Sequence, residues 1–215
     1  MNEGAEDVTE VRTVTVSREY ASGGNVIAAQ VASRLGWQLL DHDAMVGHVA
    51  QSLGTSQAEA EAHDERHEGL VAKILRNLQY IDPDFEPSTP LGATLSDEVD
   101  REAVDSIVQD AAERGQVVIV GRASQVTLAG RRDVLRVRII APIEQRITAV
   151  MQQEGLNRQE AASRIRGIDR EHAKYLEAEY HQELGDSHLF DLVVNMGFFA
   201  PEMVVNVICL LLRRQ

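Results

Sequence analysis

The stretch VRTVTVSREYASGGN, residues 11–25, joins a β-branched run to a turn that is rich in serine and glycine. The run of valine and threonine predicts a strand over residues 11–16, and residues 17–24 supply a tight turn. Residues 25–35 then place apolar side chains at helical spacing before Gly36, which is typical of a helix end. The stretch therefore predicts a strand, a tight loop and a helix in immediate succession.

The rest of the chain repeats this order of elements. Further strands are predicted at 37–40, 117–120, 134–140 and 189–195, and further helices at 57–79, 97–114, 142–154, 158–179 and 201–212, with another helix that opens at 41–45. Strands separated by helices of about ten or more residues pair in parallel through right-handed crossovers. The predicted fold is α/β, with three layers in which helices flank a parallel sheet. Its ligand crevice is expected beyond the carboxyl ends of the strands.

Composition and charge narrow the class of protein. The 215 residues suffice for one domain, expected over 11–215 after a disordered acidic lead at 1–10. A net charge of −13 argues against nucleic acid or anionic membranes as partners, so an anionic ligand needs a local basic cluster. Cys209 is the one cysteine, residues 1–10 do not resemble a secretory signal, and no apolar stretch reaches the ~20 residues that span a bilayer. These features favour a cytoplasmic protein.

The turn at Ser17–Asn25 is the first candidate site. Unpaired backbone N–H groups at a helix start favour an anion such as phosphate. Arg18 and Gly23 stand at the places of the two glycines in the G-x-x-x-x-G-K-[ST] pattern of phosphate-binding loops. The turn departs from that pattern at Arg18. Gly24 and Asn25 stand in the places of the lysine and of the hydroxyl residue that binds magnesium. The alternative is a structural glycine turn between a strand and a helix.

Two further turns face the same crevice. Arg122 follows the apolar strand at 117–120, where its guanidinium could hold a phosphate or a carboxylate through two hydrogen bonds. The alternative is a surface arginine without a role. Asp41 and Asp43 follow the strand at 37–40, and their carboxylates could hold ribose hydroxyls or, as the safer interpretation, cap a helix.

Arginines also gather in the second half of this otherwise acidic chain. Arg166 and Arg170 lie one helical turn apart with Asp169 between them, so the two arginines share a helix face that could close over phosphates as a lid. The alternative is a solvated helix in which Glu171 pairs with Lys174 and Arg166 pairs with Asp169. This cluster is the local basic region that an anionic ligand requires.

Two histidines, His63 and His67, lie one helical turn apart, a spacing that could bind zinc. The glutamate that H-E-x-x-H requires after the first histidine is missing, and no third ligand is indicated. The segment is therefore interpreted as a charged, solvated helix. Three prolines follow it, and residues 57–96 are interpreted as an insertion of helix and loop.

In this order, the motifs resemble the cytidylate kinase-like family, relatives of the P-loop nucleoside monophosphate kinases. The likeness extends over nearly the whole chain and rests on TVTVSREYASGG at 13–24, LG at 35–36 with LD at 40–41, VIVGR at 118–122, AP at 141–142 with Arg146, IDRE at 168–171 with Tyr175, and FDLVVN at 190–195. It implies a P-loop kinase-type fold with a lid-like helical segment at 156–182 and an acceptor-binding insertion at 57–96.

The resemblance also implies ATP with Mg²⁺ as phosphate donor and a nucleoside monophosphate such as CMP or dCMP as acceptor. The residues it implies for the donor are Ser17, Arg18, Ala21, Ser22, Gly23, Gly24 and Asn25. The residues predicted for the acceptor are Asp41, Asp43, Arg122 and Arg146, of which Arg122 has this role by the resemblance. For catalysis the resemblance implies Arg122, Arg166, Asp169 and Arg170. The magnesium ligand stays open, and a homo-oligomer stays possible.

A second function is kept beside the kinase. Gly24 and Asn25 replace the two chemically active residues of the loop, which favours a catalytically weak or inactive nucleotide-binding or regulatory protein of the same fold. A third hypothesis, an interaction scaffold, has only the charged helix at 57–79 in its support. Nucleotide binding with turnover indicates the first function, and binding without turnover indicates the second.

Overall fold

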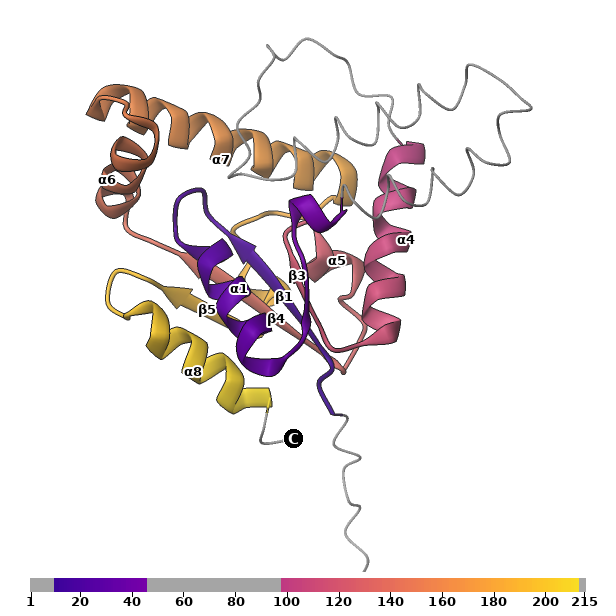
Figure 1. Ribbon diagram of the computed structural model, residues 1–215. Coiled ribbons are helices and arrows are strands. Elements are labelled where there is room, and N and C mark those ends of the chain that lie inside the picture. Colours follow the sequence, from indigo (N-terminus) through magenta and orange to yellow (C-terminus); the bar gives the residue numbers. More distant parts are fainter. Residues whose placement is uncertain (1–9, 46–97, 213–215) are drawn as a thin grey trace, which may run out of the picture.

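The sheet that the sequence predicts is present and entirely parallel. A computed structural model describes residues 10–45 and 98–212. Strands pair in the order β2-β3-β1-β4-β5 (Figure 1), and their bounds are β1 Thr13–Arg18, β2 Gln38–Leu40, β3 Val117–Val120, β4 Val134–Ile140 and β5 Leu192–Asn195. The central strand, β1, is the one that leads into the glycine-rich turn.

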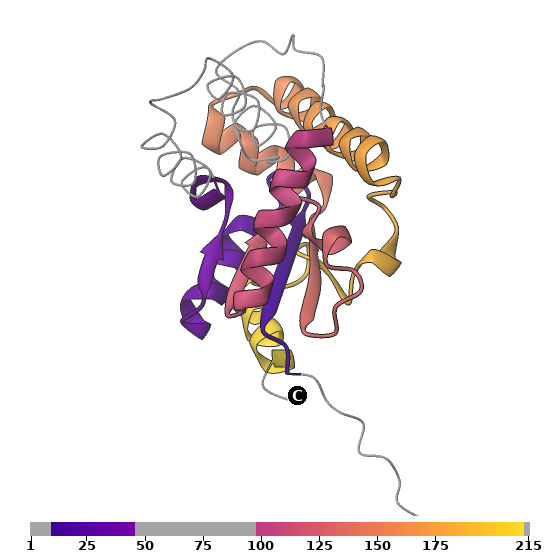
Figure 2. The same cartoon turned by 90° about the vertical axis from the view of Figure 1, so that its right-hand side faces the viewer.

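Helices cover both faces of the sheet and its carboxyl edge. They are α1 Gly24–Leu35, α4 Glu98–Arg114, α5 Ser124–Thr127, α6 Ile143–Glu154, α7 Arg158–Tyr180 and α8 Pro201–Leu212, and a 3-10 turn, η1, spans Ser187–Leu189. α1 packs against α8 on one face, and α4 with α5 lies on the other (Figures 1 and 2). α7 crosses the end of the sheet at which β1 leads into its loop. The predicted candidate residues therefore lie beneath or beside α7.

Alternation along the strands divides the core between the two faces of the sheet. Val14 and Val16 of β1 are fully buried on the face covered by α1, whose Ile27 is fully buried as well. Ile119 of β3 is fully buried on the opposite face together with Val108 of α4. A strand with both faces covered has an unbroken apolar sequence, which explains the run VVIV of β3.

Within the described residues the predicted elements agree with the observed ones to within two residues, except in two places. The largest of the small shifts is in β1, which includes Ser17 and Arg18 that the sequence assigns to the turn. The strand expected to begin at residue 189 begins at Leu192, because Ser187–Leu189 forms a 3-10 turn that the Asp186 side chain caps. The sequence also does not predict α5, since the four residues of Ser124–Thr127 are too few to show a helical period. Neither difference moves the carboxyl ends of the strands.

Several predictions lie outside the described residues. They are the acidic lead at 1–10 apart from its last residue, the insertion at 57–96, and the histidine pair His63 and His67. Cys209 is buried in the core beside α1, as the sequence suggests. Over the ranges 10–45 and 98–212, no helix combines the length and the apolar character needed to cross a bilayer.

The core on the α1 face gives a direct test of the fold. Ile27 is fully buried, whereas its neighbour Val26 in the same helix is 55% exposed. Ile27→Ala leaves a cavity and should lower the free energy of unfolding by about 2–5 kcal/mol. Val26→Ala is the matched control and should change it by less than about 0.5 kcal/mol. Urea denaturation measures both, and equal losses in the two variants would contradict the orientation of α1.

Candidate functional site

The loop between β1 and α1 has the backbone of an anion site. Ala21 and Gly23 adopt left-handed conformations, with φ of 57° and 85°. Gly23 lies at the N-cap of α1, and no side chain caps that end of the helix. The N–H groups of the first helical turn are therefore available to a ligand. Together with the helix dipole they favour a phosphate at this point.

A cavity of about 410 Å³ opens beside this loop. The loop, the start of α1, α6 and α7 supply its lining, which comprises Tyr20, Ala21, Gly23, Asn25, Val26, Ala149, Gln153, Glu154 and Arg164. Its volume is typical of pockets that hold small molecules. Among the residues predicted to bind the donor, Ala21, Gly23 and Asn25 line the cavity. The others, Ser17, Arg18, Ser22 and Gly24, are buried.

Arg146 of α6 ties the loop to α7. Its Nε donates to the carbonyl oxygen of Tyr20 at 2.7 Å, and its Nη2 donates to the two carboxylate oxygens of Asp169 at 2.8 and 2.6 Å. Its Nη1 lies 3.3 Å from a carboxylate oxygen of Glu19. Arg146 and Asp169 thus hold the loop and α7 together. The contacts with a substrate that the resemblance implies for these two residues stay predictions.

Tyr20 forms a second link between the loop and the helices. Its hydroxyl donates to Glu154 at the end of α6, and Arg164 of α7 donates to that hydroxyl at 3.3 Å. Arg164 also pairs with Glu154, at 2.6 Å. Burial, with the hydrogen bond to Glu154, raises the pKa of Tyr20 to about 12. The hydroxyl therefore stays protonated near neutral pH and serves as a hydrogen-bond donor.

Arg122 follows the carboxyl end of β3 in an unusual turn. Gly121, Arg122 and Ala123 are three consecutive left-handed residues, with φ of 68°, 62° and 49°. Such a backbone is costly for residues other than glycine, and it is concentrated at functional sites. The Arg122 side chain is 1% exposed, and its Nη2 lies 2.9 Å from Nδ1 of His42. The alternative of a surface arginine without a role is therefore excluded.

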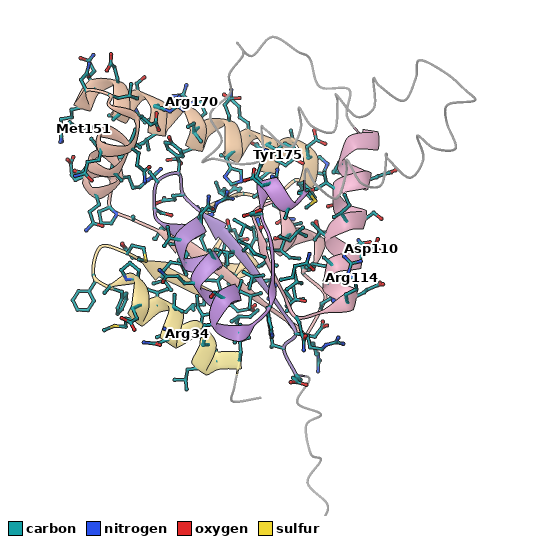
Figure 3. All side chains as sticks on the ribbon, viewed as in Figure 1. Arg34, Asp110, Arg114, Met151, Arg170 and Tyr175 are labelled. Atoms are coloured by element: carbon teal, nitrogen blue, oxygen red, sulfur yellow. The ribbon has the colours of Figure 1, made fainter. Side chains whose placement is uncertain are left out.

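Two tyrosines near the end of α7 are in contact with each other, and the charge of Arg122 acts on one of them, Tyr175. Tyr175 lies on the side of α7 that faces the sheet (Figure 3), and its ring meets that of Tyr180 edge-on with 6.0 Å between centroids. Burial raises the pKa of Tyr175 to about 12, and the charge of Arg122 acts in the opposite direction. The Tyr180 hydroxyl donates to Asp105 of α4 at 3.0 Å. Arg122 thus lies in desolvated surroundings beneath α7.

The structure separates the predicted lid residues. Asp169 faces the loop, whereas Arg166 and Arg170 are exposed. Figure 3 shows Arg170 on the outer side of α7. Glu171 pairs with Lys174 at 3.1 Å, as in a solvated helix. The catalytic roles of Arg166 and Arg170 stay predictions, and they require α7 to present another face to the phosphates.

The structure also gives the two aspartates after β2 different surroundings. The carboxylate of Asp41 accepts the N–H of Ala44 at 3.0 Å and caps a helical turn that begins at His42. The capping interpretation is therefore correct for Asp41. Asp43 is exposed. Contacts of either carboxylate with a ribose stay predictions.

Arg138 is a site residue that the motifs do not reveal. It lies in β4 beside Ser17 of β1, donates to the Ser17 hydroxyl at 3.3 Å, and stacks over the ring of Phe190 with 5.3 Å to its centroid. Burial lowers its pKa, and nearby carboxylates act in the opposite direction. Within the described ranges, no carboxylate forms an ion pair with it. A charge inside the apolar run VLRVRII, residues 134–140, is the sequence signal that could have found it.

Asn25 takes the place of a metal ligand in the loop after β1. The described residues contain no group of three or more histidine, cysteine, aspartate or glutamate side chains that could hold a metal. Asn25 stands where phosphate-binding loops place a magnesium-binding hydroxyl, and its Oδ1 accepts from Nε of Arg18 at 2.7 Å.

A parallel sheet of this strand order, with an anion-binding loop between its central strand and α1, defines a P-loop kinase-type fold. Solved structures with the same fold support this assignment. An uncharacterized protein from Eubacterium ventriosum is 16% identical and matches with a TM-score of 0.68 over 94% of this chain and 99% of its own. Shikimate kinase from Bacteroides thetaiotaomicron is 13% identical and matches with a TM-score of 0.50 over 95% and 99%. At these identities the likeness concerns the fold.

Sequence comparison defines the family. The family model described as the cytidylate kinase-like family matches residues 13–197, and the chain belongs to this family. Similar proteins include the cytidylate kinase of Ignicoccus hospitalis, 26% identical over 197 residues that cover 91% of this chain and 95% of that enzyme. The cytidylate kinase of Pyrococcus horikoshii is 33% identical over 119 residues, which cover 54% of this chain and 59% of that enzyme. The predicted family is confirmed, and a kinase-type function is supported.

The contacts of Asp169 predict an energetic link between the loop and α7. Asp169→Ala removes the acceptor of two contacts from Arg146 and of one from the Tyr20 N–H. The free energy of unfolding should fall by about 1–3 kcal/mol, because a buried guanidinium loses partners. Glu171→Ala, which breaks an exposed pair on the same helix, should cost less than about 0.5 kcal/mol. Denaturation without nucleotide measures both, and equal costs would argue against the anchoring role.

Proposed function

We propose that this protein transfers the terminal phosphoryl group of ATP to a nucleoside monophosphate, in the first instance CMP or dCMP. The observation that carries the proposal is the gathering of buried arginines at the edge where α1 begins. Arg122, Arg138 and Arg146 are 1%, 9% and 4% exposed there, in a chain of net charge −13. Burying guanidinium groups opposes folding. Phosphate groups are ligands that guanidinium groups bind through paired, charge-assisted hydrogen bonds.

The donor is assigned to the loop and to the cavity beside it. Backbone N–H groups of residues 21–25 would hold the phosphates, in accord with the uncapped N-terminus of α1. The nucleoside would extend into the cavity of about 410 Å³ between the loop, α6 and α7. Arg164 lines that cavity, so it is the α7 arginine that we propose to lie beside the donor.

The acceptor is assigned to the part of the carboxyl edge that Arg122 and Arg138 share. Each guanidinium can hold a phosphate through two hydrogen bonds. Phosphoryl transfer needs the acceptor held in line with the donor and the developing charge stabilised, and it needs little covalent chemistry from the protein. Arginines that are already desolvated provide that stabilisation without reorganisation during the reaction. Arg166 and Arg170 keep their predicted role, which requires α7 to shift when nucleotides bind.

The choice of nucleotides comes from the family. The model that matches the chain is named for cytidylate kinase, and so is the enzyme of Ignicoccus hospitalis that it resembles over most of its length. CMP or dCMP as acceptor, ATP as donor and Mg²⁺ as its accompanying ion are proposed on this ground. A cytoplasmic location is proposed as well, in accord with the single cysteine, which is buried.

A second candidate function is nucleotide binding without transfer. It is favoured by Gly24 and Asn25 in the places of the lysine and the magnesium-binding hydroxyl, and by the engagement of Asn25 Oδ1 with Arg18. Calorimetry with ATP and with CMP, beside an assay for ADP, separates the two functions. Binding without ADP formation indicates the second, and no binding of either nucleotide excludes both.

The proposed activity is tested with ATP, Mg²⁺ and each of CMP, dCMP, UMP and AMP as acceptor. Formation of ADP and of the matching diphosphate should depend on the monophosphate and be fastest with CMP or dCMP. Chromatography of the nucleotides measures both products. A protein that is folded and yields no diphosphate with any of the four would contradict the proposal.

Arg122→Gln should lower kcat/KM for the acceptor by about 10- to 100-fold, because a hydrogen bond to a charged group contributes about 1.5–3 kcal/mol. Arg131→Gln is the matched control. Arg131 pairs with Asp133 at 2.7 Å, before the start of β4 and so at the opposite edge of the sheet. The control should leave kcat/KM unchanged. Initial rates at varied CMP measure the effect, and equal rates for both variants would remove Arg122 from the acceptor site.

A further inference from the structure

The loop after β1 differs from the phosphate-binding pattern at both of its ends. Aligned with G-x-x-x-x-G-K-[ST], Arg18 stands at the first glycine, Gly24 at the lysine and Asn25 at the hydroxyl residue. The lysine of that pattern reaches the β- and γ-phosphates of the bound nucleotide. The loop thus carries a cation where the pattern has glycine, and glycine where the pattern has the cation.

The side chain of Arg18 occupies the space that a side chain at position 24 would need. A Cβ atom added to Gly24 would lie 2.5 Å from Cβ of Arg18 and 2.9 Å from its Cγ. Non-bonded carbon atoms in proteins do not approach so closely, so position 24 accepts only glycine while Arg18 is present. Arg18 is 1% exposed, and its Nε donates to Oδ1 of Asn25 at 2.7 Å. Its guanidinium therefore lies beside the first turn of α1.

We propose that Arg18 carries out the task of the missing lysine. Its guanidinium reaches past Gly24 from the end of β1 and binds the β- and γ-phosphates of a nucleoside triphosphate. This inference rests on the proposed function, which assigns those phosphates to the N-terminus of α1. The two departures from the pattern are then one exchange, because a cation moved to position 18 requires glycine at position 24. No bond forms or breaks at Arg18, which binds and stabilises charge.

Asn25 acquires a defined role in this exchange. A guanidinium offers only donors, so the amide oxygen of Asn25 is the atom that faces Arg18. The NH₂ group of the same amide is therefore directed away from Arg18. It can donate to a phosphate oxygen, but it cannot coordinate magnesium. The exchange thus turns the position of a metal ligand into a position that binds phosphate.

Moving the cation back to position 24 tests the inference. The double variant Arg18→Gly with Gly24→Lys restores the order of the pattern and places the lysine in the space that Arg18 vacates. Arg18→Met keeps an unbranched side chain but removes the charge. Arg34→Met is the matched control, since Arg34 lies in the last turn of the same helix. Calorimetry with ATP gives the dissociation constant of each variant, and thermal melting without nucleotide shows that each is folded.

We expect Arg18→Met to weaken ATP binding by about 10- to 100-fold, Arg34→Met to leave it unchanged, and the double variant to recover most of the loss. A folded Arg18→Met that binds ATP as tightly as Arg34→Met overturns the inference and leaves the proposed function standing. A folded double variant that binds ATP no better than Arg18→Met overturns it too. If Arg18→Met does not fold, the double variant is compared with Arg34→Met, and ATP binding by the double variant that is about 10- to 100-fold weaker than that of Arg34→Met overturns the inference. A wild-type protein that binds no ATP overturns the proposed function as well.

Discussion

The guanidinium of Arg146 is the group on which the arrangement of the site depends. It donates hydrogen bonds to the carbonyl oxygen of Tyr20 in the loop and to the carboxylate of Asp169 on α7, and it pairs with the carboxylate of Glu19. Because it is buried, separating the loop from α7 would leave a charge without partners, which is strongly unfavourable. The neighbouring contact of Arg164 with the Tyr20 hydroxyl supports the same geometry. The phosphate-ready end of α1 is thereby held beneath α7.

Charge is distributed in this protein in a way that suits a small anionic ligand. The chain as a whole is acidic, yet the arginines that follow or belong to β1, β3 and β4 near their carboxyl ends are buried: Arg18, Arg122 and Arg138. Arg138 donates to a hydroxyl and stacks over an aromatic ring, and within the described ranges no carboxylate forms an ion pair with it. An acidic exterior disfavours polyanions such as nucleic acid. The buried basic edge is still suited to a nucleotide small enough to reach it. Surface charge and burial together therefore favour small anionic ligands over large ones.

Periodicity was sufficient for most of the fold, and motif position was sufficient for part of the site. Parallel strands bring their carboxyl ends to one edge, so the loop after β1 and Arg122 after β3 could be placed together before any coordinates. The sequence could not show which charged side chains of α7 face the loop and which face solvent, because the face that a helix turns inward is set by tertiary contacts. Asp169 faces inward, and Arg170 does not. Arg138 was missed because a strand pattern shows which residues are apolar but does not show which charged side chain is buried at the carboxyl edge.

The central claim is that a triphosphate binds at the loop between β1 and α1. The most direct measurement is a crystal structure of the protein with a non-hydrolysable ATP analogue. The account predicts the β- and γ-phosphates within hydrogen-bonding distance of the backbone N–H groups of residues 22–25 and of the Arg18 guanidinium. A triphosphate bound elsewhere on the protein, with this loop unchanged and in contact with solvent alone, would contradict it.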